Sequence, residues 1–394
     1  MFPLLLAGAL LMDVSFREHT IARDLKGGYQ VVAYDVNQDG KTDLFALASG
    51  MSELVWFEAP DWKRHVLAIG MQRMINLAAC PGVNEIVVAQ GFENEPKRSA
   101  GIVSVLTPGA DRTQPWTVHE IDRLTTSHRL RCADIDGSGH KVIVNAPLAG
   151  AKAAAPDYRD HIPVVYYKPG EWKRTLIGEH LEGVLHGIYI YPWARPGKRA
   201  KPHDEILTAS FVGIHRYFLK PDRTWGIERI STGAPEPWPK SGSSDIAVGH
   251  VRKERFIAAI EPWHGYAVAI YTKPKPDRPW MRNVIDDSLQ DGHTIQTADL
   301  NGDGKDEVIA GYRGPGRSVY IYYFNGSTWH KYPLDKGGIA AAACAVADLN
   351  GDSRPDIACI GSATMNLKWY ENLSAPPMPT PTTARARAGL SLRR

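Results

Sequence analysis

A short pattern of residues recurs seven times along the chain: an aromatic residue opens a stretch that closes on an aliphatic one. The six internal copies begin at Trp62, Trp116, Trp172, Trp225, Trp280 and Trp329, and a seventh copy occupies residues 16–21 near the N-terminus. Successive copies are about 50 residues apart, which is the period of four-stranded units arranged around an axis. We therefore predict one outer strand in each of seven repeats.

Apolar runs predict the other strands of each repeat. Continuous runs, as expected for strands covered on both faces, occur at 43–47, 85–89, 141–144, 205–208, 256–259, 307–310 and 356–359. A following strand carries tyrosine and tryptophan at 54–57, 164–167, 268–271, 319–322 and 367–370, which we interpret as packing between neighbouring repeats. The last repeat, 337–374, ends after its third strand. The prediction is an all-β fold: a seven-bladed β-propeller closed by the N-terminal strand, which completes the last blade.

This interpretation places one domain at residues 13–374. Residues 1–12 are apolar and have the length of the apolar region of a secretory signal, but no basic residue precedes them, so a periplasmic or secreted location and a cytoplasmic one both stay open. Residues 375–394 are rich in Pro, Thr, Ala and Arg, which predicts a disordered tail. No apolar run is long enough to cross a bilayer, and we expect no membrane partner.

The charge and the cysteines narrow the class of protein. The chain has 46 basic and 43 acidic residues, a net charge of +3, and four of the arginines lie in the tail. A nearly neutral domain argues against a nucleic-acid partner. The four cysteines are predicted to lie on inner strands, where we interpret them as buried thiols. Cys344 and Cys359 are expected on neighbouring strands, but their spacing alone does not establish a disulfide.

Three repeats carry an acidic turn with oxygen-bearing side chains at its first, third, fifth and ninth positions. The residues are Asp35, Asn37, Asp39 and Asp43; Asp299, Asn301, Asp303 and Glu307; and Asp348, Asn350, Asp352 and Asp356. This spacing resembles the start of an EF-hand loop and predicts structural calcium or magnesium. The alternative is a turn capped by its own side chains. A fourth copy at 134–142 has Val142 in place of the last carboxylate, and we expect no ion there.

Histidines recur at one position of the predicted inner strands. Counting back six residues from Asp299, Asp134 and the turn at Pro192 gives His293, His128 and His186. They should line the mouth of the central channel opposite the acidic turns. Loops between second and third strands open on the same face, and they carry His264, Tyr158, His161 and Arg313. Titratable groups that converge in a concave site suit proton transfer or metal binding.

Several segments carry a family resemblance. The acidic turns and the strands after them resemble FG-GAP (VCBS) repeats, in which the metal loops are structural. The segments 127–131, 186–192 and 261–265 resemble the propeller of the aldos-2-ulose dehydratase family, over about residues 25–373. The resemblance implies dehydration of 2-keto sugars such as 1,5-anhydrofructose, with His128 matching the histidine implicated in the family. The family's fungal enzyme continues into cupin domains that isomerise the product, whereas this sequence ends at the propeller.

The chemistry that fits is β-elimination, which begins when a base removes the proton alpha to a ketone. Neutral imidazole suits that role, and His128 is our candidate. A zinc or other divalent ion held by His186, His264 and His293, or these imidazoles with Arg129 or Arg313, would stabilise the enolate. The expected substrate contacts come from Trp263, Tyr158, Glu261 and His161.

Three functions stay open. The first is a carbon–oxygen lyase acting on a small keto sugar, either a dehydratase or an enzyme that cleaves 3-keto-glycosides. The second is a polysaccharide lyase acting on a uronate, against which the nearly neutral charge argues. The third is a propeller without catalytic activity that binds a glycan or a protein. The sequence predicts no oligomeric state.

Overall fold

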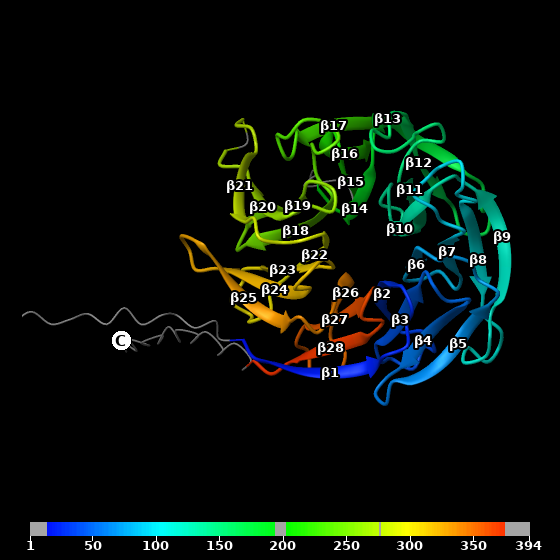
Figure 1. The fold of residues 1–394 in the computed structure, drawn as a ribbon. Helices are drawn as coiled ribbons and strands as arrows, with labels where there is room; N and C mark the ends of the chain where they lie inside the picture. Colours follow the sequence, from blue (N-terminus) through cyan, green and yellow to red (C-terminus); the bar gives the residue numbers. More distant parts are fainter. Residues whose placement is uncertain (1–13, 194–201, 276, 375–394) are drawn as a thin grey trace, which may run out of the picture.

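The computed structural model describes residues 14–193, 202–275 and 277–374. In these residues, 28 strands form seven four-stranded sheets arranged radially around an axis (Figure 1). The predicted seven-bladed β-propeller is confirmed. The suggested signal segment at 1–12 and the tail at 375–394 lie outside the described residues. Among the described residues no helix is long and apolar enough to span a membrane.

Each blade runs from an inner strand beside the axis to an outer strand at the rim. The inner strands are β2 (Gly28–Tyr34), β6 (Asn76–Ala79), β10 (Ser127–Ala133), β14 (Leu185–Tyr191), β18 (Asp245–Val251), β22 (Gly292–Ala298) and β26 (Ala341–Ala347). The second strands are β3 (Asp43–Ala48), β7 (Ile86–Gln90), β11 (Val142–Pro147), β15 (Glu205–Ser210), β19 (Glu254–Glu261), β23 (Glu307–Tyr312) and β27 (Asp356–Gly361).

The two remaining sets of strands complete the blades. The third strands are β4 (Glu53–Glu58), β8 (Ile102–Thr107), β12 (His161–Tyr167), β16 (Gly213–Leu219), β20 (Ala267–Thr272), β24 (Ser318–Phe324) and β28 (Leu367–Asn372). The outer strands are β5 (Lys63–Ile69), β9 (Thr117–Arg123), β13 (Thr175–Glu182), β17 (Trp225–Ser231), β21 (Met281–Asp286), β25 (Trp329–Lys336) and β1 (Phe16–Ala22). Every pair of adjacent strands within a blade is antiparallel.

The ring closes through the N-terminal strand, as predicted. The last sheet has the order β1-β28-β27-β26, so the chain's first strand covers the edge that β28 would otherwise expose (Figure 1). Side chains reinforce the pairing: the ring of His19 stacks on Trp369 at 4.5 Å, and Glu18 pairs with Lys368 at 2.8 Å. Closure removes the free sheet edges on which other chains could pair.

The core lies between blades and is built from the apolar second strands and the aromatic third strands. All residues of β3, β15 and β27 are buried. The largest fully buried side chains include Trp56, Tyr167, Tyr217, Tyr271, Tyr322 and Tyr370, all on third strands. The interpretation of the aromatic residues as packing between blades is confirmed.

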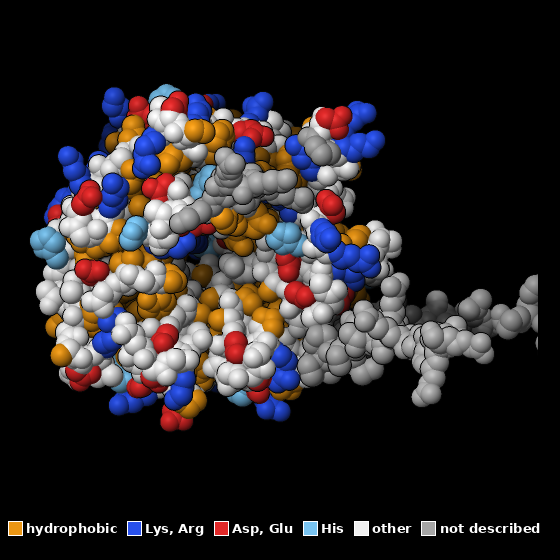
Figure 2. Space-filling model, turned by 180° about the vertical axis from the view of Figure 1, so that it is seen from behind, with side chains coloured by type: hydrophobic (Ala, Val, Ile, Leu, Met, Phe, Trp, Pro, Cys, Tyr) orange, Lys and Arg blue, Asp and Glu red, His pale blue; other side chains and the backbone are white. Residues whose placement is uncertain are grey.

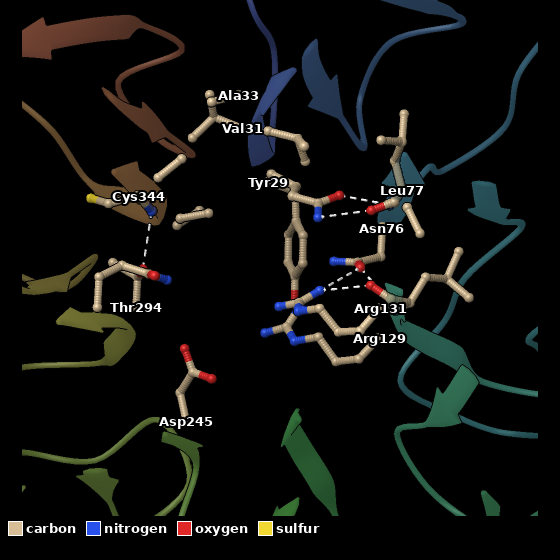
Figure 3. A pocket seen from close by; sticks show the side chains of 18 of the residues that line it. Tyr29, Val31, Ala33, Asn76, Leu77, Arg129, Arg131, Asp245, Thr294 and Cys344 are labelled. Atoms are coloured by element: carbon tan, nitrogen blue, oxygen red, sulfur yellow. Dashed lines mark hydrogen bonds between the residues drawn. The ribbon is translucent and has the colours of Figure 1, made fainter. Parts of the chain in front are cut away.

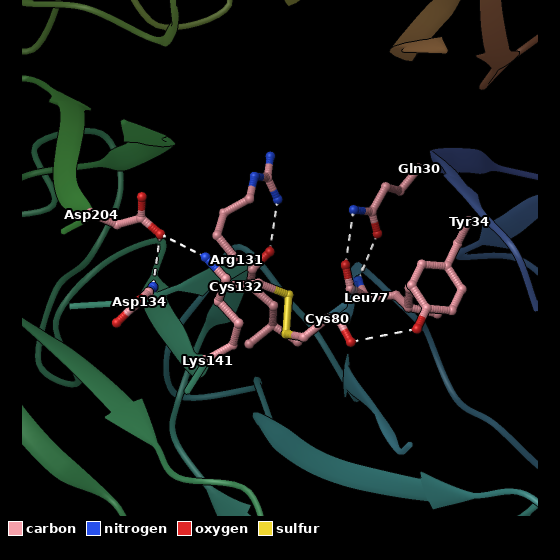
Figure 4. The surroundings of a disulfide bond; sticks show 10 residues. Gln30, Tyr34, Leu77, Cys80, Arg131, Cys132, Asp134, Lys141 and Asp204 are labelled. Atoms are coloured by element: carbon pink, nitrogen blue, oxygen red, sulfur yellow. Dashed lines mark hydrogen bonds and ion pairs between the residues drawn. A yellow bond between two sulfur atoms is a disulfide. The ribbon is translucent and has the colours of Figure 1, made fainter. Parts of the chain in front are cut away.

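The cysteines form two disulfides, so their interpretation as buried thiols is wrong. Cys80 and Cys132 link the inner strands of neighbouring blades across a Cα–Cα distance of 5.5 Å (Figure 4). Cys344 and Cys359 stand directly opposite each other on β26 and β27. The first pair was not predicted because the sequence does not show which residues of neighbouring inner strands come close enough to bond.

Replacing Cys80 and Cys132 together by serine is expected to lower the free energy of unfolding by about 4 kcal/mol. The disulfide closes a loop of 52 residues, and the stabilisation grows slowly with loop length. Loss of the second disulfide, which closes 15 residues, should cost about 3 kcal/mol. Urea unfolding of the oxidised protein and both double variants measures this. Equal stability of all three would contradict it.

Candidate functional site

Five of the seven inner strands carry a β-bulge at their second residue. The pairing to the neighbouring strand skips one residue there in β2, β10, β14, β22 and β26. The bulged residues are Tyr29, His128, His186, His293 and Ala342. A bulge re-aims a side chain that regular alternation would direct elsewhere. Four ring-bearing side chains from four blades thereby meet at the propeller axis.

His264 reaches the same point from the loop that follows β19. A tight turn, closed by a hydrogen bond from Gly265 N to Pro262 O (2.8 Å), carries it there. Glycine is required after His264, because a Cβ at position 265 would lie 2.3 Å from the carbonyl oxygen of Glu261. His264 itself has φ +48°, a conformation uncommon for residues other than glycine. Blade five, whose inner strand has no bulge, thus supplies its imidazole from a loop.

Three of the imidazoles form a compact triad. The ring centroids of His186, His264 and His293 are 4.9–5.1 Å apart, and Nε2 of His186 lies 3.3 Å from Nε2 of His264. Two nitrogens bound to one tetrahedral zinc ion at about 2.05 Å are separated by about 3.3–3.4 Å. Within the residues that the structure describes, this is the one group of three His, Cys, Asp or Glu side chains close enough to share an ion.

The outer nitrogens of the triad are all engaged. Nδ1 of His293 donates to the carbonyl oxygen of Ala342 (2.6 Å), and Nδ1 of His186 contacts Ser244 Oγ (3.2 Å). Nδ1 of His264 lies 3.3 Å from Asp291 Oδ1 and 3.2 Å from Arg313 Nη2. Nε2 of His293 is buried and has no partner. One ligand atom of each of the three residues lies within 4.8 Å of the other two, with Nδ1 of each ring in contact with a neighbouring polar group.

His128 lies next to the triad but is closed off. Its ring centroid is 5.0 Å from that of His186, and the residue is 1% exposed. Nε2 of His128 lies 2.8 Å from the hydroxyl of Tyr29, and Nδ1 is buried without a partner. Tyr29 was not among the residues predicted for the site, and its ring also stands edge-on to that of His293, with the ring centroids 5.2 Å apart.

Burial and neighbouring arginines keep the imidazoles neutral. The pKa values of His128, His186 and His293 are lowered well below the ordinary value, first by burial and then by the charges of Arg129 or Arg313. The same causes lower the pKa of His264 to about 3. All four rings therefore keep a free lone pair at neutral pH, which both a base and a metal ligand require.

These shifts predict acid sensitivity. The folded-state pKa values lie below the unfolded value of about 6.5, so the unfolded state binds the protons more tightly. Stability is fully present above about pH 6.5 and should fall below it, by up to about 1.4 kcal/mol per pH unit for each buried histidine. The raised pKa values of Asp43, Asp356 and Glu307 act in the opposite direction over this range, so the effect is measured as the difference in urea unfolding between the wild type and the His128→Ala variant from pH 8 to 5. A difference that does not change with pH would contradict the prediction.

One member of the triad, His293, lines a cavity inside the channel. The cavity has a volume of about 320 Å³ and includes Tyr29, Arg129, Arg131, Asp245 and His293 in its lining (Figure 3). The guanidinium groups of Arg129 and Arg131 form no ion pair with any described residue. Burial and the charge of Arg129 lower the pKa of Arg131 to about 10. The face of the molecule that is turned away in Figure 1 is hollowed near its centre, and acidic and basic side chains are interspersed over it (Figure 2).

The expected substrate contacts lie outside the triad. Glu261 is fully buried and holds Arg282 at 2.7 Å and the hydroxyl of Tyr271, so it fixes the loop of His264 rather than facing a ligand. Tyr158 is 5% exposed and packs against Trp263. His161 opens β12 and pairs in register with Glu182 on the outer strand. Of these four residues, Trp263 alone contacts the histidines: its ring centroid lies 4.8 Å from that of His264.

Arg129 and Arg313 do belong to the site. Nη2 of Arg129 lies 3.4 Å from Nε2 of His186, and its guanidinium stands 5.6 Å from the ring of Tyr29. Arg313 is held by Asp291 through two hydrogen bonds of 3.0 and 3.1 Å. Both cations therefore border the imidazoles.

In the acidic turns, backbone N–H groups donate hydrogen bonds to the side-chain carboxylates. The ninth-position carboxylates are buried and accept backbone N–H groups, as Asp43 does from Val36 and Ala59 at 2.9 Å. Burial, together with the other carboxylates of each turn, raises the pKa of Asp43 and Asp356 to about 6 and that of Glu307 to about 8. The turns are thus capped by their own side chains. A bound cation would reduce the remaining repulsion between the carboxylates of each turn. Calcium or magnesium stays a prediction.

The fourth turn is completed by a neighbouring blade. Asp204 accepts the backbone N–H of Asp134 at 2.7 Å and pairs with Lys141 Nζ at 3.0 Å (Figure 4). The lysine ammonium thus supplies the positive charge beside this turn.

Fold and site define a class: a seven-bladed β-propeller whose axis carries a cluster of neutral histidines. Comparison with known proteins shows which family this propeller resembles. Residues 100–275 match the family model "Aldos-2-ulose dehydratase, beta-propeller domain", and residues 299–359 match the FG-GAP-like repeat. Aldos-2-ulose dehydratase of Phanerodontia chrysosporium is 26% identical over 314 residues, which cover 71% of this chain and 34% of that protein. The chain therefore spans about a third of the length of this curated relative.

Solved structures support the fold alone. The WD40 β-propeller domain of Doa1 matches with a TM-score of 0.54 and 13% identity, over 90% of this chain and 97% of that one. BBS1N in complex with ARL6DN matches with a TM-score of 0.56 and 11% identity, over 91% and 96%. The chain is a propeller with FG-GAP-like repeats, similar to the propeller domain of aldos-2-ulose dehydratase.

Proposed function

We propose that this protein is a carbon–oxygen lyase that acts on a keto sugar by removing the proton alpha to the carbonyl and expelling a group from the β-carbon. The observation that carries the proposal is the convergence of four neutral imidazoles from four blades on one axial position. Similarity to the propeller of a dehydratase supports the reaction class. A scaffold without catalytic function has no need to bury four titratable rings against one another.

The triad of His186, His264 and His293 is the proposed holder of a divalent ion, with zinc favoured by three neutral imidazoles and an open fourth position. The orphaned Nε2 of His293 and the spacing of the other two Nε2 atoms support this assignment. When bound, such an ion supplies a Lewis acid for the carbonyl oxygen of the substrate. The acidic turns are the proposed holders of structural calcium or magnesium.

The chain's own residues divide the remaining work. His128, neutral and joined to Tyr29, is the proton acceptor. Arg129 and Arg313, at the border of the imidazoles, stabilise the negative charge of the enolate. Asp291 holds Arg313 and His264 in place. Trp263, beside His264, shields the site from water.

The test is to incubate the purified protein with 1,5-anhydrofructose and with 3-keto-glucosides and to follow the ultraviolet absorbance of a conjugated enone. Turnover of either substrate that disappears in the His128→Ala variant supports the proposal. The His119→Ala variant, altered on an exposed outer strand, is the matched control. Sugar binding without enone formation by any substrate would leave a propeller that only binds its ligand.

A further inference from the structure

The cavity in the channel offers a ligand different contacts from those predicted at the mouth. Its lining includes Tyr29 and His293 but not His128, Trp263 or His161. Its volume of about 320 Å³ is at the lower end of the range of small-molecule pockets, which suits one sugar ring. The cavity is therefore a better container for a monosaccharide than the surface around Trp263.

Tyr29 separates His128 from this cavity. Among the described residues, the imidazole of His128 has one hydrogen-bond partner, the hydroxyl of Tyr29, and Nδ1 of His128 is buried among side chains, with Phe92 at a centroid distance of 5.3 Å. Tyr29 itself is half-buried and lines the cavity. A proton that moves between a ligand in the cavity and His128 must therefore pass through the phenol oxygen.

The walls of the cavity carry groups that can bind a polyol. Arg131 is held from behind by Asn76 Oδ1 (3.1 Å) and by the carbonyl oxygen of Leu130 (2.8 Å). Asp245 projects from the opposite wall toward the two guanidinium groups without pairing with either (Figure 3). Guanidinium donors on one wall and a carboxylate acceptor on the other suit the hydroxyl groups of a sugar.

Resting on the proposed function, we propose that the keto sugar binds in the channel cavity, between Arg131 and Asp245, and that Tyr29 is a catalytic residue that relays protons to and from His128. In the first step the α C–H bond breaks and leaves its electron pair in the enolate. The proton goes to Tyr29 Oη, which passes its own proton to Nε2 of His128. In the second step the carbonyl re-forms and the β C–O bond breaks. The leaving oxygen takes the proton from Tyr29 Oη, and His128 returns its proton to Tyr29.

The first experiment compares Tyr29→Phe with the wild-type protein on the keto sugar that gives an enone. Loss of the relay should lower kcat by about 100- to 10,000-fold, the usual contribution of a positioned acid or base, while KM changes by less than about threefold. The primary isotope effect of α-deuterated substrate should rise, because proton removal becomes more rate-limiting. Tyr34→Phe is the matched control: it lies on the same strand but outside the cavity, and should behave as wild type.

The second experiment locates the sugar without relying on turnover. Binding of 1,5-anhydroglucitol, which has no carbonyl group to react, is measured by calorimetry. Ala345→Leu, which adds volume to the cavity lining on β26, and Asp245→Asn, which keeps volume but removes a charge, should each weaken binding at least about tenfold. Tyr34→Phe, which lies outside the cavity, should bind as wild type does. Thermal melting verifies that each variant is folded. If Ala345→Leu does not fold, the binding test rests on Asp245→Asn.

The outcomes separate the inference from the function on which it rests. An active wild-type protein with an equally active Tyr29→Phe variant overturns the relay alone. Unchanged affinity in both cavity variants overturns the channel site and returns the sugar to the histidine mouth. A wild-type protein that is inactive on every keto sugar overturns the proposed function, and the relay with it.

Discussion

Replacing His293 by alanine is expected to abolish retention of a divalent ion and to lower lyase turnover by at least about 100-fold. The substitution removes one of three ligand atoms that lie within 4.8 Å of one another, and Nε2 of His293 is buried without a hydrogen-bond partner. Even changes to groups that only orient ligands weaken metal sites by about 10- to 100-fold, so loss of a ligand should cost more. Elemental analysis after dialysis and the enone assay measure the two effects.

Two controls sharpen this prediction. His264→Ala and His186→Ala should reproduce the loss, because each removes one member of the same triad. His119→Ala should retain the ion and full activity, since that residue is exposed on β9. One equivalent of zinc retained by the His293→Ala protein would show that the triad is not the binding site.

Starting the chain at residue 23 is expected to prevent cooperative folding. The truncation removes β1, which pairs with β28 along its whole length and whose His19 and Glu18 contact Trp369 and Lys368. Blade seven would keep three strands, and Lys368, a largely buried cation, would lose one of its two carboxylate partners. These losses consume much of the 5–15 kcal/mol that typically separates folded from unfolded domains.

Thermal melting and sedimentation measure the effect of this truncation. A chain that starts at residue 14 keeps β1 and should melt like the full-length protein. Addition of a peptide covering residues 14–23 to the shorter chain should restore part of the stability, because the exposed edge of β28 is a template for one more strand. A chain starting at 23 that melts at the wild-type temperature would refute the closure as a source of stability.

Strand order and closure could be predicted because they depend on local alternation and on repetition. An apolar run such as 356–359 indicates a covered strand wherever it occurs, and the missing fourth strand after residue 374 has one replacement, at residues 16–21. The convergence of His128, His186 and His293 followed from the same regularity, because equivalent positions of a radial repeat lie at equal heights around the axis, whereas His264 was placed by the face on which its loop opens.

Tyr29 carried a signal that we did not use. The count of six residues that connects Asp299 to His293 also connects Asp35 to Tyr29, so the first blade contributes a residue at the same bulge. By contrast, the roles of Glu261 and Tyr158 could not be predicted. Their side chains turn into packed interiors, which depends on neighbours from other strands such as Tyr271 and Arg282. The pairing of Cys80 with Cys132 likewise depends on contacts between blades.

The complete acidic turns are unevenly distributed around the ring. They belong to the blades of β2, β22 and β26, which are three consecutive blades, and the middle one contains the junction of the chain's two ends. The remaining blades lack such turns or, like that of β10, use a lysine. The calcium or magnesium that we propose for these turns would therefore stabilise the blade closed by β1 and its two neighbours, so that a chelator should destabilise this part of the propeller first.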